Sequence, residues 1–139
     1  MRLVLDSNEY IFAFGSAQKS VCAVLIDTIL SAYPDCSLRI PRLIVEEVSR
    51  HLAPEAFKEF IGLINSLTAI DEDFVVPFEL GARYEARGLK PADAFIAAYV
   101  EWTGSEVLVS ENRHFLRRTF SLPFQILNAD HCITLLKAK

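Results

Sequence analysis

Short apolar runs and longer amphipathic runs follow one another along the chain. Apolar runs bounded by polar or turn-forming residues predict β-strands at residues 2–5, 37–40, 106–110 and 125–127. Between them, apolar residues recur at i, i+3, i+4 and i+7, the spacing of helices that bury one face. Such helices are predicted around residues 21–29, 44–52, 57–67, 78–87, 91–103 and 130–136. Strands separated by helices are typical of a parallel α/β sheet.

Proline and glycine mark where these elements begin and end. Pro54 separates two helical runs, which we expect to form a helical hairpin between the second and third strands. Gly88 is placed to end one helix and Pro91 to open the next. The chain has no internal repeat, low-complexity segment or Ser/Gly-rich linker. The predicted fold is therefore one domain, residues 1–139, built as a three-layer α/β/α sandwich with a mainly parallel central sheet.

The composition indicates where the protein resides and whether its cysteines pair. Of 139 residues, 52% are hydrophobic, but no apolar run reaches the roughly 20 residues of a membrane-spanning helix. Asp6 interrupts the N-terminus before a signal-peptide core can form, so we expect a cytoplasmic protein with no membrane partner. Cys22, Cys36 and Cys132 are odd in number and lack a Cys-x-x-Cys pattern, so buried free thiols are predicted.

Three acidic residues lie in separate predicted elements. Asp6 ends the first strand, Glu47 lies in the helix after the second strand, and Asp93 lies in the first turn of the helix opened by Pro91. Each has an ordinary alternative reading as a helix cap, a first-turn charge or a solvated helix position. Together they offer the oxygen ligands that Mg²⁺ and Mn²⁺ prefer. Carboxylates gathered for a cation also reconcile a net charge of −4 with a nucleic-acid substrate.

Four segments carry these acids in a shared order and spacing. They are residues 4–8 (Val-Leu-Asp-Ser-Asn), 44–48 (Ile-Val-Glu-Glu-Val), 92–98 (Ala-Asp-Ala-Phe-Ile-Ala-Ala) and 109–115 (Val-Ser-Glu-Asn-Arg-His-Phe). In these segments the chain resembles the PIN-domain nucleases, and most closely the small ribonuclease toxins of virulence-associated protein C (VapC) type. The resemblance implies a PIN-like fold in which Asp6, Glu47 and Asp93 bind Mg²⁺ or Mn²⁺. It also implies cleavage of single-stranded RNA, inhibition by a small antitoxin, and a homodimer.

The chain departs from the family at the fourth acidic position, which is Asn112. An Asn carbonyl can ligate a cation but contributes no charge. We therefore expect weaker affinity for a second cation, unless the neighbouring Glu111 turns inward to replace Asn112. Ser7, Asn8 and Ser110 are expected to hydrogen-bond the ligating carboxylates or a bridging water. The departure leaves a second interpretation open, in which the chain is a non-catalytic PIN-fold module that binds RNA or protein. A haloacid-dehalogenase-type phosphatase ranks well below both, because its second Asp would fall at Asn8.

The resulting hypothesis is a metal-dependent endoribonuclease that cleaves by metal-activated water. It uses Asp6, Glu47 and Asp93 as catalytic carboxylates. Arg113, Arg117 and Arg118 form a local basic cluster that we expect to contact RNA phosphates, although a solvated helix face explains them equally well.

Overall fold

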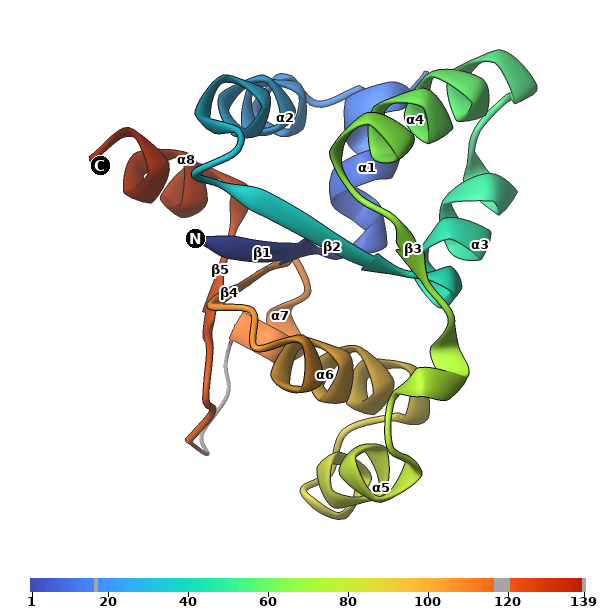
Figure 1. Ribbon diagram of the computed structural model, residues 1–139, viewed down its shortest axis with the longest axis vertical. Coiled ribbons are helices and arrows are strands. Elements are labelled where there is room, and N and C mark those ends of the chain that lie inside the picture. Colours follow the sequence, from blue (N-terminus) through green and yellow to red (C-terminus); the bar gives the residue numbers. More distant parts are fainter. Residues whose placement is uncertain (17, 117–120, 139) are drawn as a thin grey trace.

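A single parallel sheet organises the computed structural model, which describes residues 1–16, 18–116 and 121–138 (Figure 1). The strand order is β3-β2-β1-β4-β5, and every neighbouring pair is parallel. The strands are β1 (Arg2–Leu5), β2 (Ser37–Pro41), β3 (Ile70–Asp71), β4 (Val107–Val109) and β5 (Gln125–Leu127). The predicted α/β class with a parallel sheet is confirmed.

Helices cover both faces of this sheet and make the three predicted layers. They are α1 (Ser7–Phe14), α2 (Ser20–Ala32), α3 (Arg42–His51), α4 (Pro54–Leu67), α5 (Phe78–Ala86), α6 (Pro91–Thr103), α7 (Arg113–Leu116) and α8 (Ala129–Lys137), with a 3-10 turn η1 (Asp73–Val75). Helices α1 to α4 lie on one side of the sheet and α5 and α6 on the other, while α8 packs beside α2 (Figure 1). Helices α3 and α4 follow β2 as predicted, and both pack against α1.

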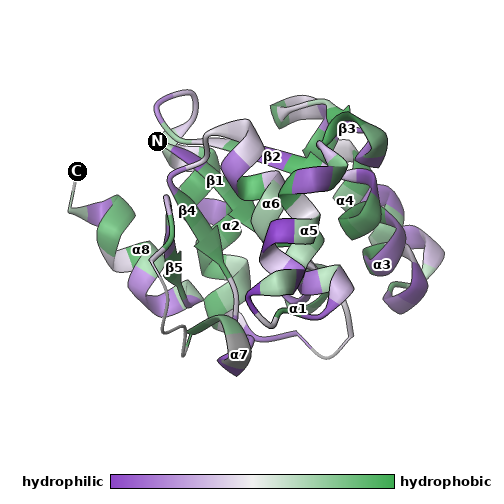
Figure 2. Ribbon diagram, turned by 90° about the horizontal axis from the view of Figure 1, so that it is seen from below, coloured by the Kyte–Doolittle hydropathy of each residue, from purple (hydrophilic) through white to green (hydrophobic). Residues whose placement is uncertain are grey.

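The sheet is apolar on both faces because helices cover both. The β1 and β4 residues Leu3–Leu5 and Val107–Val109 are buried, and Figure 2 shows these strands in hydrophobic colours between the helices. Cys22, Cys36 and Cys132 are buried free thiols, as predicted. In the part of the chain that the structure describes, no helix combines the length and apolar character needed to cross a membrane.

The two-residue strand β3 was not predicted from the sequence. It is held by Asp71, whose Oδ2 accepts from Arg39 Nε at 3.0 Å and from Arg39 Nη2 at 2.8 Å. The hydroxyl of the buried Tyr99 donates to the same oxygen. Because Arg39 lies on β2 and Tyr99 on α6, one carboxylate joins β2, β3 and α6. The contact fixes the position of the helix that carries Asp93.

The carboxyl ends of β1 and β4 lie side by side. Leu5 pairs with Val109, and the next residue, Asp6, donates its backbone N–H to the Val109 carbonyl at 2.9 Å. Ser110 continues the edge by donating its N–H to the Leu127 carbonyl at 2.9 Å. Ligands of open parallel sheets bind beyond this edge. Asp6 and Ser110 are therefore brought together although 104 residues separate them in sequence.

Candidate functional site

A polar pocket of about 280 Å³ lies beyond the carboxyl ends of β1 and β4. It brings together the three predicted acids, Asp6 from the start of α1, Glu47 from α3 and Asp93 from α6. The residues that line it are Asp6, Ser7, Asn8, Leu43, Glu47, Ala92, Asp93, Ile96, Glu111 and Asn112. Ser110 lies behind it, fully buried. We call this pocket the acid pocket.

Hydrogen bonds hold the Asp6 carboxylate in one orientation. Asp6 is the N-cap of α1, and its Oδ1 accepts from the Ser7 backbone N–H at 2.8 Å. Its Oδ2 accepts from Ser110 Oγ at 2.9 Å. The capping reading of Asp6 is thus correct. It coexists with a place in the pocket, because each carboxylate oxygen has a second lone pair.

The acid pocket concentrates negative charge around Asp6. Burial raises the pKa of the Asp6 carboxyl, the hydrogen bonds from Ser110 and Ser7 oppose that rise, and the charges of Glu47 and Asp93 add to it. Burial and like-charge repulsion both disfavour the ionised form. A bound cation would reverse the sign of the local field and stabilise all three carboxylates.

The donor set fits a hard divalent cation that keeps water ligands. Among the described residues, no group of three or more His, Cys, Asp or Glu side chains is close enough to hold a metal ion directly. Mg²⁺ typically binds through one or two carboxylates and retains several waters. The residues available to hold it are the carboxylates of Asp6, Glu47 and Asp93 and the side-chain amide of Asn112.

Two solved structures share this architecture. One is the crystal structure of VapBC2 from Rickettsia felis bound to a DNA fragment from their promoter, with a TM-score of 0.63 and 18% sequence identity over 92% of this chain and 98% of that chain. The other is FitAcB from Neisseria gonorrhoeae, with a TM-score of 0.60 and 16% identity over 93% of this chain and 99% of that chain. The fold is PIN-like. Identity this low shows the fold alone. No protein-family model and no curated protein matches the sequence.

Asn112, which the resemblance assigns to the fourth acidic position of the family, lines the acid pocket. Its backbone N–H donates to Ser110 Oγ at 3.0 Å, and its carbonyl accepts from Phe115 and Leu116 at 3.1 Å each, which begins α7. Glu111 also lines the pocket, but its Oε2 accepts from the Ala129 backbone N–H of α8 at 3.0 Å. One of the two Glu111 carboxylate oxygens is therefore hydrogen-bonded to the start of α8.

Glu9 is an acidic neighbour of the site that the sequence reading did not identify. Glu9 lies three residues after the N-cap Asp6, but it forms no capping box, because the Asp6 N–H is bonded to the Val109 carbonyl. Glu9 is fully buried; its Oε1 accepts from Cys22 Sγ at 3.5 Å, and its Oε2 has no N–H or O–H donor among the described residues. Burial, a hydrogen bond with Glu111 and the charge of Glu111 raise the pKa of Glu9 well above its usual range. A proton held on Glu9 supplies the hydrogen bond between the two carboxyl groups.

The remaining predicted contacts are only partly described. Arg113 is exposed at the first position of α7, which follows the strand end that carries Ser110. Arg117 and Arg118 lie outside the described residues. The apolar wall residues Leu43, Ala92 and Ile96 were not predicted as part of the site. Leu43 and Ala92 each lie at the second position of a helix, so helix starts were the available signal.

Proposed function

We propose that the chain is a Mg²⁺- or Mn²⁺-dependent endoribonuclease that cleaves single-stranded RNA and acts as the toxin of a toxin–antitoxin pair. One observation carries the proposal: carboxylates from α1, α3 and α6 line a single pocket at the carboxyl edge of the sheet. The PIN-like fold and two neighbours from toxin–antitoxin complexes agree with it, and they support a small antitoxin as partner.

Asp6, Glu47, Asp93 and Asn112 would hold the cation. When bound, a divalent cation lowers the pKa of water and stabilises charge on phosphoryl oxygens. Ser7 and Ser110 orient the Asp6 carboxylate through the two hydrogen bonds described above. Leu43 and Ile96 form apolar walls that limit solvent, which strengthens electrostatic interactions inside the pocket. Arg113, exposed at the first position of α7, would contact an RNA phosphate.

Replacing Glu47 by Gln is expected to lower metal-dependent RNA cleavage by on the order of 100-fold, because the site loses one of the three carboxylate charges proposed to bind the cation. The measurement is cleavage of a labelled single-stranded RNA with Mn²⁺ and with EDTA. Glu46→Gln is the matched control, because Glu46 is the preceding residue of α3 but is exposed and outside the pocket. Growth arrest on expressing the chain alone should also require Glu47 and not Glu46. Equal cleavage by both variants would contradict the assignment.

Replacing Ser110 by Ala is expected to lower cleavage by roughly 10-fold, because Asp6 Oδ2 loses its donor while the carboxylate remains. The loss should appear as a higher Mn²⁺ concentration needed for half-maximal cleavage, since an unoriented carboxylate binds a cation less well. Ser66→Ala is the control, because the exposed Ser66 donates to the Leu63 carbonyl of its own helix and does not line the acid pocket. An unchanged Mn²⁺ titration for Ser110→Ala would show that this hydrogen bond does not support the site.

A non-catalytic binding module is the second candidate, favoured by one observation. The fourth position is the uncharged Asn112, and its neighbour Glu111 is engaged by α8. RNA binding without cleavage at saturating Mn²⁺, by wild type and Glu47→Gln alike, would select this function.

A further inference from the structure

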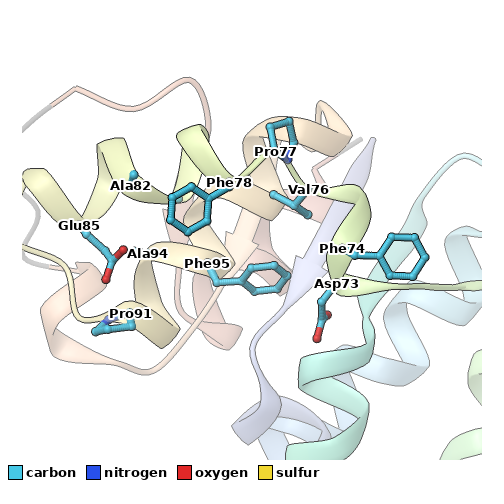
Figure 3. Close-up of a pocket in the computed structure, with 11 residues that line it drawn as sticks. Asp73, Phe74, Val76, Pro77, Phe78, Ala82, Glu85, Pro91, Ala94 and Phe95 are labelled. Atoms are coloured by element: carbon cyan, nitrogen blue, oxygen red, sulfur yellow. The ribbon is translucent and has the colours of Figure 1, made fainter.

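A second cavity, an apolar hollow of about 540 Å³, has walls from η1, α5 and α6. Figure 3 shows the rings of Phe78 and Phe95 in the space between the helices. The space exists because α5 presents the small residues Gly81 and Ala82 to it. Sites that hold small molecules or groups of that size have volumes of roughly 300–1,000 Å³. We call this cavity the aromatic hollow.

The aromatic hollow adjoins the acid pocket on two sides. On α6, Asp93 lines the acid pocket and the next residue, Ala94, lines the hollow, with Cα atoms about 3.8 Å apart. Opposite α6, Leu43 of the acid pocket donates its backbone N–H to Asp73 Oδ1 of the hollow at 3.0 Å. A single strand with a phosphate at the acid pocket therefore has the hollow within reach of a neighbouring base.

Exposed aromatic rings mark the rim of the hollow. Phe74 on η1 is 84% exposed and Phe78 at the start of α5 is 83% exposed, whereas the other exposed large hydrophobic side chains among the described residues reach at most 47%. Unstacked bases of single-stranded RNA stack on aromatic side chains. We propose that the aromatic hollow binds one nucleobase of a single-stranded RNA whose phosphate lies at the acid pocket. This inference rests on the proposed function, because it takes RNA as the ligand of the acid pocket.

The charges in the hollow suit a base and not a phosphate. The charged residues that line it are Asp73 and Glu85, which would repel a phosphate but can accept from the N–H groups of a base. The bond from Leu43 holds the Asp73 carboxylate in place. A base with an exocyclic amino group, such as adenine, cytosine or guanine, is therefore favoured over uracil.

Lys90 supplies positive charge where the two cavities meet. It is the exposed N-cap of α6, and the two residues after it, Pro91 and Ala92, line the hollow and the acid pocket respectively. The start of a helix also favours an anion. The phosphate that joins the base in the hollow to the nucleotide at the acid pocket would lie against Lys90.

The test is binding of a short labelled single-stranded RNA to the full chain, measured by fluorescence anisotropy in EDTA so that no cleavage occurs. Gly81→Leu fills the hollow, and Phe78→Ser removes a stacking ring; each should weaken binding by about 10-fold. The dependence of affinity on salt should stay unchanged in both, because a base carries no charge. Lys90→Ala should instead flatten the salt dependence, because it removes a phosphate contact.

Gly62→Leu is the matched control. Gly62 and Gly81 are both helical glycines with no atom within 4 Å of an added Cβ, but Gly62 lies on α4 and does not line the hollow. Gly62→Leu should bind RNA like wild type. Phe78→Ser alters an exposed ring, so it keeps the fold and decides the matter if Gly81→Leu unfolds.

RNAs that lack one base at a time test the base itself. Wild type should lose affinity when one particular base is removed or replaced by uracil, and Gly81→Leu should no longer distinguish these RNAs. Such a paired loss identifies the hollow as the place where that base binds. A general loss of phosphate contacts would not depend on which base is missing.

Wild-type affinity in both Gly81→Leu and Phe78→Ser would overturn the inference and leave the hollow to a protein partner. Cleavage in Mn²⁺ by the same preparations separates it from the proposed function. If wild type cleaves while both hollow variants bind like wild type, only the base site is wrong. Hollow-dependent binding without cleavage supports the base site and selects the non-catalytic module. A wild type that binds no RNA would overturn both the base site and RNA as the substrate.

Discussion

Replacing Asp6 by Asn is expected to abolish metal-dependent RNA cleavage, with a loss on the order of 1,000-fold or more, while the fold stays intact. Asn caps a helix about as well as Asp, so the Ser7 N–H keeps an acceptor and α1 keeps its start. What disappears is the charge of a half-buried carboxylate that accepts from Ser110 and is repelled by the charges of Glu47 and Asp93. The measurement is single-turnover cleavage in Mn²⁺, together with thermal unfolding of the same preparation.

Asp27→Asn is the matched control for this substitution, because Asp27 is exposed on α2 and does not line the acid pocket. It should cleave like wild type. If Asp6→Asn retains most of the activity while its unfolding temperature is unchanged, the metal-site proposal is wrong. If the variant unfolds, Asp6 acts first as a cap, and Glu47→Gln then decides whether the pocket is catalytic.

Replacing Glu9 by Gln is expected to stabilise the protein at neutral pH by on the order of 1–3 kcal/mol. The pKa of the buried Glu9 carboxyl is raised in the folded state, so the folded protein holds a proton that the unfolded chain releases above about 4.5. The stability contribution is therefore fully present below that pH and is lost as pH rises toward the folded-state pKa, by up to about 1.4 kcal/mol per pH unit. Gln carries no such cost and can still accept from Cys22 and donate to Glu111.

The measurement is the free energy of unfolding by denaturant between pH 4 and pH 8, a range chosen to span the ordinary Glu pKa. Wild type should lose stability with rising pH across this range, and Glu9→Gln should show a shallower slope. The exposed Glu59 on α4 provides the control, because Glu59→Gln should leave the slope unchanged. Parallel slopes for wild type and Glu9→Gln would show that the buried Glu9 carboxyl does not hold a proton in the folded state.

The predicted elements agree with the structure where the apolar pattern extends over four or more residues. The strand at Arg2–Leu5 and the helix Pro91–Thr103 agree with their predicted positions because burial on one or both sides leaves a regular apolar spacing. Strand β3 was missed because Ile70–Asp71 is too short to show a period. Its stability comes from Arg39 and Tyr99, which are distant in sequence.

Several residues that line the acid pocket could also be predicted from the sequence. Asp6 and Ser110 follow apolar strands, and parallel strands place their carboxyl ends on one edge of the sheet. The family resemblance selects Glu47 over Glu46, and in the structure Glu47 lines the pocket while Glu46 is exposed. The burial of Glu9 was less visible, although its place four residues before the buried Ala13 puts both on one face of α1.

The sequence by itself determined the strands β1, β2, β4 and β5, the parallel sheet and the edge at which the acids meet, because these follow from local periodicity and from the direction of parallel strands. Only the tertiary structure decided which oxygens Ser110 and Ala129 engage, that Glu9 adjoins Glu111, and that Phe74 and Phe78 are exposed. Those features depend on contacts between residues far apart in the chain. No local pattern distinguishes a Phe that packs in the core from one that protrudes beside a hollow, because that depends on how α5 and α6 pack together.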